Sequence, residues 1–142
     1  MLGGHMGLLR INHIILGTLD IESTAKFYST LFGYKQVSPF VDIGTGNTGV
    51  VLSHEDGPEL LLVPFSKERL PNPQHIAFEV DEEFFGEILA NCASHKIQIR
   101  SLPNLDASPG EPVRHEELGK SFKHFYFCDP NRVNLEIMTR AF

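Results

Sequence analysis

Apolar positions in the first half of the chain follow strand-like and helical spacing in a fixed order. Residues 8–16 form a short apolar run rich in branched side chains, which is typical of a β-strand. Asp20 then stands where it can cap a helix whose apolar residues recur as far as Phe32, and Gly33 follows where a left-handed cap is favoured. Three further strands are predicted over 34–41, 49–53 and 59–63. The first half is therefore predicted to have the order β-α-β-β-β.

The second half repeats this pattern. A strand is predicted over 74–80, a helix over 81–95, and three strands over 97–102, 122–128 and 133–138. Aligning the halves places His13 over His75, and each half closes on a strand with a glutamate, Glu59 or Glu136. Such a repeat indicates two copies of one unit. Residues 103–121 show no periodicity, and a long loop of this kind is usually a functional lid or a mobile segment.

This organisation predicts one α+β domain over residues 8–142, built from two βαβββ modules. Module one covers about 8–65 and module two about 72–142, and residues 1–7 resemble the remnant of an expression tag. The chain has 142 residues and a net charge of −6 without a basic block, which argues against nucleic acid or an anionic membrane as a partner. No apolar run approaches the roughly 20 residues that span a bilayer. Two cysteines give no zinc spacing, so we expect a reduced, cytoplasmic protein.

The candidate chemistry lies in polar residues that sit inside predicted strands. Taken singly, His13, His75 and Glu136 are each more often structural or solvent-exposed residues than ligands. Together, two imidazoles and a carboxylate at equivalent places form a set that binds Fe, Zn, Mn, Ni or Co and leaves coordination positions open. Glu59 is a possible fourth ligand, although an exposed glutamate after a Gly-Pro turn is nearly as plausible. One divalent metal ion is therefore predicted.

From 9 to 137 the chain resembles the vicinal oxygen chelate superfamily, which includes glyoxalase I, extradiol dioxygenases and bleomycin-resistance proteins. The resemblance is carried by the segments INHIIL (11–16), FYSTLFGY (27–34), PELLLVP (58–64), QHIAFEV (74–80) and FYFCDPNRVNLEIM (125–138). It implies paired modules whose sheet curves around a metal. It also implies that His13, His75 and Glu136 are metal ligands and that Glu59 matches the fourth ligand of glyoxalases.

The resemblance implies a homodimeric enzyme that acts on a small substrate chelated through two neighbouring oxygens. The first expectation is a lyase or isomerase of glyoxalase type, with Glu136 or Glu59 as general base. One alternative is a non-haem iron extradiol-type dioxygenase assisted by Tyr126, which lies ten residues before Glu136. Another is a metal-free protein that binds an antibiotic, although such proteins typically lack the ligand triad.

Two positions depart from the family pattern, and three more are candidate substrate contacts. Arg132 replaces the usual turn glycine, and Ile15 stands where fosfomycin-resistance enzymes place a threonine. The candidate substrate contacts are His115, Arg114 and Lys123, in or near the long loop. A solvated charged rim is the plainer interpretation of the two basic residues.

Overall fold

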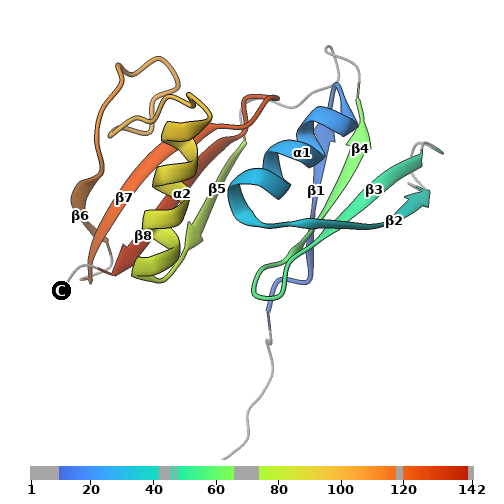
Figure 1. Cartoon of the computed structure of the whole chain (residues 1–142), viewed down its shortest axis with the longest axis horizontal. Helices are drawn as coiled ribbons and strands as arrows, with labels where there is room; N and C mark the ends of the chain where they lie inside the picture. Colours follow the sequence, from blue (N-terminus) through green and yellow to red (C-terminus); the bar gives the residue numbers. More distant parts are fainter. Residues whose placement is uncertain (1–9, 42–45, 47, 66–73, 118–119, 141–142) are drawn as a thin grey trace, which may run out of the picture.

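The computed structural model of the chain describes residues 10–41, 46, 48–65, 74–117 and 120–140. They form two modules side by side, each a sheet with one helix packed on it (Figure 1). The first contains β1 His13–Thr18, α1 Ile21–Phe32, β2 Lys35–Val41, β3 Thr48–Ser53 and β4 Glu59–Pro64. The second contains β5 His75–Glu79, α2 Glu82–Ser94, β6 Val113–Glu117, β7 Lys120–Cys128 and β8 Asn134–Arg140.

The two modules share one strand order. The sheets run β1-β4-β3-β2 and β5-β8-β7-β6. In each sheet the first strand of the module pairs in parallel with the last, and the other neighbours are antiparallel. The repeated βαβββ order confirms the predicted α+β fold. The prediction for residues 1–7 lies outside the described residues.

Both helices begin at an aspartate that satisfies a free backbone N–H. The Asp20 carboxylate accepts from the Glu22 amide at 3.2 Å, and the Asp81 carboxylate accepts from the Phe84 amide at 2.8 Å. Gly33 ends α1 with a φ of 81°, which a residue with a side chain adopts only at a cost. These caps confirm the predicted starts of both helices and the end of the first.

The strand predicted over 97–102 is not formed, and β6 takes its place at the edge of the second sheet. Arg100 makes only isolated bridges, to Pro109 and to Tyr126 of β7. Pro103 follows this segment and has no N–H, so it cannot donate a ladder hydrogen bond that would continue a strand. β6 has the sequence VRHEE, in which apolar and polar residues do not alternate, so the sequence pattern does not predict a strand there. Charged residues of this kind are nevertheless common on edge strands.

A buried hydrogen-bond network joins the two modules. The Tyr28 hydroxyl of α1 donates to the Asp129 carboxylate at 2.8 Å, and the Asn131 amide donates to the hydroxyls of Thr18 and Thr24 at 3.2 and 3.0 Å. The ring of Phe32 packs against aromatic rings of the second module. The turn between β7 and β8 is therefore fixed against the first module by both polar and apolar contacts.

That turn contains the departure from the family pattern noted at Arg132. Arg132 has a φ of 65°, the left-handed conformation that glycine adopts without strain. Its amide donates to the Asp129 carbonyl at 3.1 Å, which keeps the turn tight. The arginine thus takes the backbone geometry that the missing glycine would have had.

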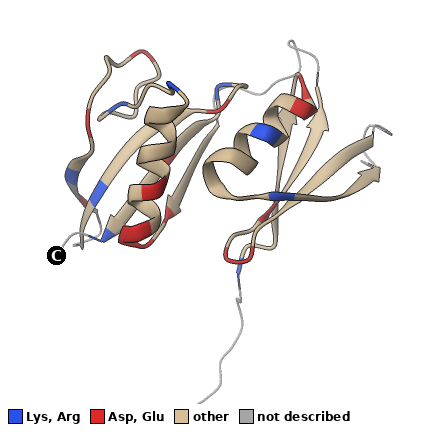
Figure 2. Ribbon diagram, in the orientation of Figure 1, with Lys and Arg blue, Asp and Glu red and all other residues tan. Residues whose placement is uncertain are grey.

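Three further features of the structure bear on membrane spans, on the distribution of charge and on the cysteines. No helix in the described ranges is long and apolar enough to cross a membrane. Acidic and basic residues occur in both modules (Figure 2). Cys92 and Cys128 are free thiols, and burial raises the pKa of Cys92 to about 12, which favours its unreactive neutral form.

Candidate functional site

His75 and Glu136 lie on the face of the second sheet that turns away from α2. On β8, Leu135 and Ile137 face the core, so Asn134 and Glu136 point to the opposite face by strand alternation. His75 Nε2 lies 3.1 Å from Glu136 Oε1, and His75 Nδ1 lies 3.1 Å from the Asn134 carbonyl oxygen. A carbonyl only accepts, so Nδ1 carries the hydrogen. In the neutral ring, the Nε2 lone pair therefore faces the carboxylate.

Sequence reasoning missed His124 as a member of this site. Its Nδ1 lies 3.1 Å from Glu136 Oε2, so each oxygen of the carboxylate faces a different imidazole. His124 and Glu136 are both buried, at 5% and 6% exposure. A signal was available, because a hairpin centred on Asn131 pairs Tyr126 with Glu136 and places His124 two residues further along the same face.

Tyr126, predicted as a catalytic residue, is buried among the site residues. Its ring centroid lies 5.1 Å from that of His124 and 6.1 Å from that of His75. The Arg100 guanidinium lies over the same ring at 5.9 Å. The structure therefore places Tyr126 beside both imidazoles, packed on β7 next to Glu136.

Arg100 is a buried cation that joins the site to the loop that follows it. Its guanidinium donates to the side-chain oxygen of Asn134 and to the backbone carbonyls of Pro103 and Asn104. The Asn134 side chain in turn donates to the Pro103 carbonyl at 2.9 Å. Because the Asn134 backbone carbonyl accepts from His75, these contacts tie the loop to the histidine that faces Glu136.

The first module carries the other two predicted ligands. His13 begins β1 as His75 begins β5, so the two histidines are equivalent in the repeat. Glu59 on β4 is paired with His13, whereas His75 is paired with Asn134. The strand positions therefore match Glu59 with Asn134, and the residue that matches Glu136 is Leu61. Glu59 and Glu136 thus lie on equivalent strands, as predicted, but at positions two residues apart in the strand register.

The four predicted ligands do not come together within one chain. In the described part of the chain, no group of three or more His, Cys, Asp or Glu residues is arranged to hold a metal ion. His75 and Glu136 are in contact on the second sheet, and His13 and Glu59 are neighbours on the first. The structure thus separates the predicted ligands into two pairs, one on each sheet.

Two of the predicted substrate contacts, Lys123 and Arg114, lie on the other side of the second sheet from Glu136. Lys123 points to the helix side of the sheet, where its amine lies 3.7 Å from Glu82 and 5.2 Å from the Phe85 ring centre. Arg114 is its register partner on β6, so its side chain leaves the sheet on that same side. The side chain of His115 lies outside the described residues.

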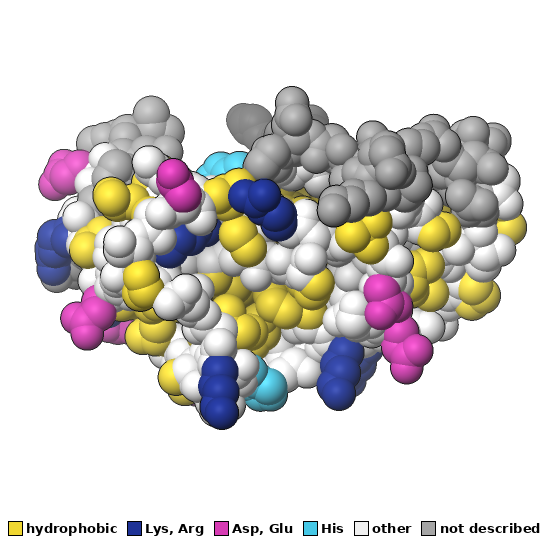
Figure 3. All heavy atoms as spheres, turned by 90° about the horizontal axis from the view of Figure 1, so that it is seen from above, with side chains coloured by type: hydrophobic (Ala, Val, Ile, Leu, Met, Phe, Trp, Pro, Cys, Tyr) yellow, Lys and Arg dark blue, Asp and Glu magenta, His cyan; other side chains and the backbone are white. Residues whose placement is uncertain are grey.

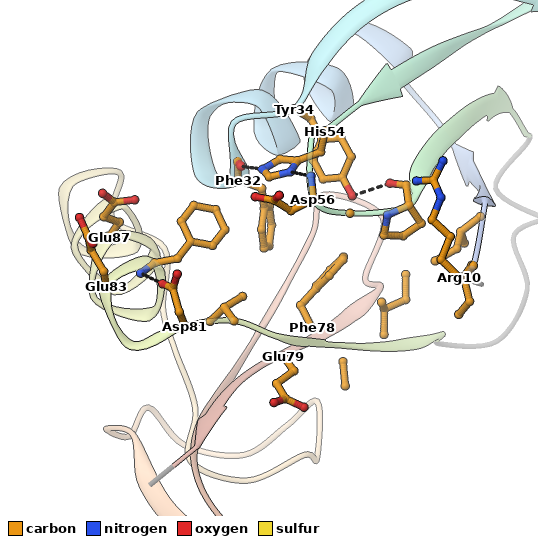
Figure 4. Close-up of a pocket in the computed structure, with 18 residues that line it drawn as sticks. Arg10, Phe32, Tyr34, His54, Asp56, Phe78, Glu79, Asp81, Glu83 and Glu87 are labelled. Atoms are coloured by element: carbon orange, nitrogen blue, oxygen red, sulfur yellow. Dashed lines mark hydrogen bonds between the residues drawn. The ribbon is translucent and has the colours of Figure 1, made fainter. Parts of the chain in front are cut away.

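A cavity of about 800 Å³ lies between the modules, with Ile14, Ile76 and Phe78 among its lining residues. Ile76 and Phe78 alternate with His75 along β5, so these side chains point away from the Glu136 face. His54 lines the first-module side of this cavity, and its ring nitrogens make hydrogen bonds with the Phe32 carbonyl at 2.9 Å and the Asp56 amide at 3.1 Å (Figure 4). The cavity is therefore distinct from the histidine–glutamate cluster.

Three solved structures illustrate what the fold resembles. The chain is 26% identical to one described as Oxidase ChaP-H2, with a TM-score of 0.72 and coverage of 94% of this chain and 95% of that one. For Oxidase ChaP-H1 the values are 26%, 0.69, 94% and 98%. TnmS3, an antibiotic binding protein from Streptomyces sp. CB03234, shares the fold at 14% identity, a TM-score of 0.66, and coverage of 96% and 100%.

No curated protein matches the chain. The family model for the Glyoxalase/Bleomycin resistance protein/Dioxygenase superfamily matches residues 10–137. This match covers nearly the whole chain and agrees with the paired modules and with the solved relatives. The chain belongs to the Glyoxalase/Bleomycin resistance protein/Dioxygenase superfamily.

Proposed function

We propose that the chain is a divalent-metal-dependent enzyme that acts on a small substrate through two neighbouring oxygen atoms. The ligands would be His13, His75 and Glu136. The contact between His75 Nε2 and Glu136 Oε1, at 3.1 Å, carries this proposal because in the neutral ring a nitrogen lone pair there faces a carboxylate. A proton or a divalent ion stabilises such a pair. Two ligand atoms that each lie about 2.1 Å from one ion, at an angle near 90°, are about 3 Å apart, so the pair fits a shared ion.

The strand register favours a ligand set with a single carboxylate. Leu61 stands in β4 where Glu136 stands in β8, and an apolar side chain cannot ligate. Two imidazoles and one carboxylate form the facial triad of non-haem iron oxygenases. We therefore propose oxidation of the substrate by dioxygen as the reaction class; the iron that these residues would hold would offer open coordination positions and pass electrons from the substrate to dioxygen. The 26% identity to two oxidases supports this choice.

The chain's own residues would bind and orient the reacting groups. The Asn134 backbone carbonyl keeps the hydrogen of His75 on Nδ1 and leaves Nε2 free to ligate, and Arg100 holds the side chain of the same asparagine. Tyr126 and His124 form the wall beside Glu136. Because this wall is buried, it excludes water from one side of the site and strengthens its electrostatic interactions.

A lyase or isomerase is the second candidate function. It is favoured by one observation, the pairing of Glu59 with His13 on adjacent strands, which brings a carboxylate next to the first-module ligand. In this case Glu59 would act as the general base that moves a proton next to a substrate carbonyl. The two candidates therefore differ in the role of Glu59 and in the identity of the metal.

Elemental analysis of protein purified without chelators tests the reaction class. We expect about one iron per chain, and we expect the ferrous protein to give a nitrosyl EPR signal with nitric oxide because coordination positions are open. Nickel, cobalt or zinc without such a signal would favour the lyase or isomerase. A protein that neither contains nor takes up a metal would contradict both candidates and favour metal-free binding of a small molecule.

We further propose that a second copy of the chain completes the site. The first module exposes apolar side chains near His13: Ile15 lies two residues further along β1, on the same face, and is 47% exposed, and Ile11, just before β1, is 67% exposed. Hydrophobic side chains also reach the surface near the middle of the molecule (Figure 3). In a homodimer, His13 of one protomer could join His75 and Glu136 of its partner, which would unite the two partial ligand sets.

Complementation between two deficient variants tests this shared site. His13→Gln and Glu136→Gln are each expected to lose tight metal binding alone. When they are co-expressed, about half of the dimers are mixed and each carries one complete site of two, so the metal content should recover to about a quarter of the wild-type value. The measurement is metal per chain after gel filtration. Recovery no greater than for either variant alone would show that each chain builds its own site.

A further inference from the structure

His124 occupies a position that the proposed ligand set does not use. It lies on β7, which pairs with β6 and β8, and Glu136 lies on β8, which pairs with β5 and β7. Both residues therefore belong to interior strands held by ladders on two sides. His124 Nδ1 and Glu136 Oε2 are 3.1 Å apart, and both side chains are buried. The contact is thus fixed by the most constrained part of the second sheet.

The chemistry of the two groups shows which of them donates the hydrogen bond. An ionised carboxylate only accepts, so His124 donates from Nδ1 to Oε2. The other oxygen, Oε1, faces His75 Nε2 at the same 3.1 Å distance. The two oxygens of Glu136 are therefore divided between the two histidines, one engaged by a donor and the other turned toward a nitrogen lone pair.

We propose that His124 is a positioning residue that limits Glu136 to one-oxygen ligation. By holding Oε2, it leaves Oε1 as the oxygen available to an ion shared with His75. This inference rests on the proposed function. A hydrogen bond to a ligating carboxylate restrains its rotation and tunes its basicity, which affects both the affinity and the geometry of the metal site. The ring of Tyr126, centred 5.1 Å from that of His124, supports the imidazole from the side.

Two substitutions at position 124 separate the hydrogen bond from the packing. His124→Phe keeps an aromatic ring but removes the donor. His124→Asn removes the ring but keeps an amide N–H near the place of Nδ1, since both atoms branch from Cγ. The probe is Co²⁺, titrated into purified dimer against a competing chelator, with visible absorption reporting the coordination geometry and thermal unfolding reporting the fold.

We expect His124→Phe to weaken Co²⁺ binding by about 10- to 100-fold and to change the absorption spectrum. His124→Asn should restore the wild-type spectrum and bring the affinity closer to the wild-type value. Wild-type affinity and spectrum in His124→Phe would overturn the role of His124, and so would equal losses in both variants. If the wild-type dimer binds no Co²⁺, the proposed metal dependence fails first, and the inference falls with it.

Discussion

Replacing Glu136 by glutamine is expected to lower the affinity of the protein for a divalent metal by more than about 100-fold. Loss of a hydrogen bond around a ligand costs about 10- to 100-fold, and Glu136 is proposed as the ligand itself. The glutamine amide keeps the size of the side chain and can still accept from His124, but it has no negative charge to offset the ion. The measurement is isothermal titration with Mn²⁺ or Co²⁺, accompanied by a thermal unfolding curve.

Glu59→Gln is the matched control for this substitution, because it makes the same chemical change on the corresponding strand of the other module. The register of β4 pairs Glu59 with His13 but places Leu61 where a second glutamate would match Glu136. We therefore expect Glu59→Gln to change the affinity by less than about threefold, within the range of a lost surface charge. Equal losses in the two variants would replace the triad with a four-ligand set and would favour lyase or isomerase chemistry.

The repeat in the sequence located the two histidines correctly because each begins an edge strand that follows the same pattern. Periodicity assigns residues to faces, and His75 and Glu136 share a face as predicted. Periodicity does not set which residues lie opposite one another on neighbouring strands. For that reason the sequence places Glu59 and Glu136 on equivalent strands but does not show that the pairing of β4 with β1 matches Glu59 with Asn134.

Longer-range features were beyond the reach of local patterns. The buried guanidinium of Arg100 is held by backbone carbonyls of the loop that follows it, which a sequence does not display. The β6 strand lies inside the segment predicted as an irregular loop, because an edge strand needs no apolar face to pair with β7. Whether a second copy of the chain supplies His13, as proposed, also depends on complementary surfaces, which sequence motifs do not reveal.

Asp129→Ala is expected to destabilise the fold by about 3 kcal/mol. The carboxylate accepts from the Tyr28 hydroxyl at 2.8 Å and from the amides of Asn131 and Val133 at 2.7 and 2.9 Å. Alanine would leave these donors without their acceptor, and each buried unsatisfied group costs about 1–3 kcal/mol. Tyr28→Phe removes one donor and leaves the acceptor with two others, so we expect a smaller loss of about 1 kcal/mol. Urea unfolding measures both.

The pH dependence of the same site distinguishes the charge of Asp129 from its hydrogen bonds. Burial raises the pKa of Asp129 above its ordinary value of 3.8, although the hydrogen bonds that it accepts oppose the rise. As the pH increases from 3.8 through the raised pKa, the unfolded chain releases this proton before the folded one, so the contribution of Asp129 to stability falls. Asp129→Asn cannot ionise, and the stability of the wild type relative to this variant should therefore decrease over that range. Urea unfolding of both proteins from pH 4 upward gives this difference and cancels the other titrating groups, and a difference that rises with pH would contradict the raised pKa.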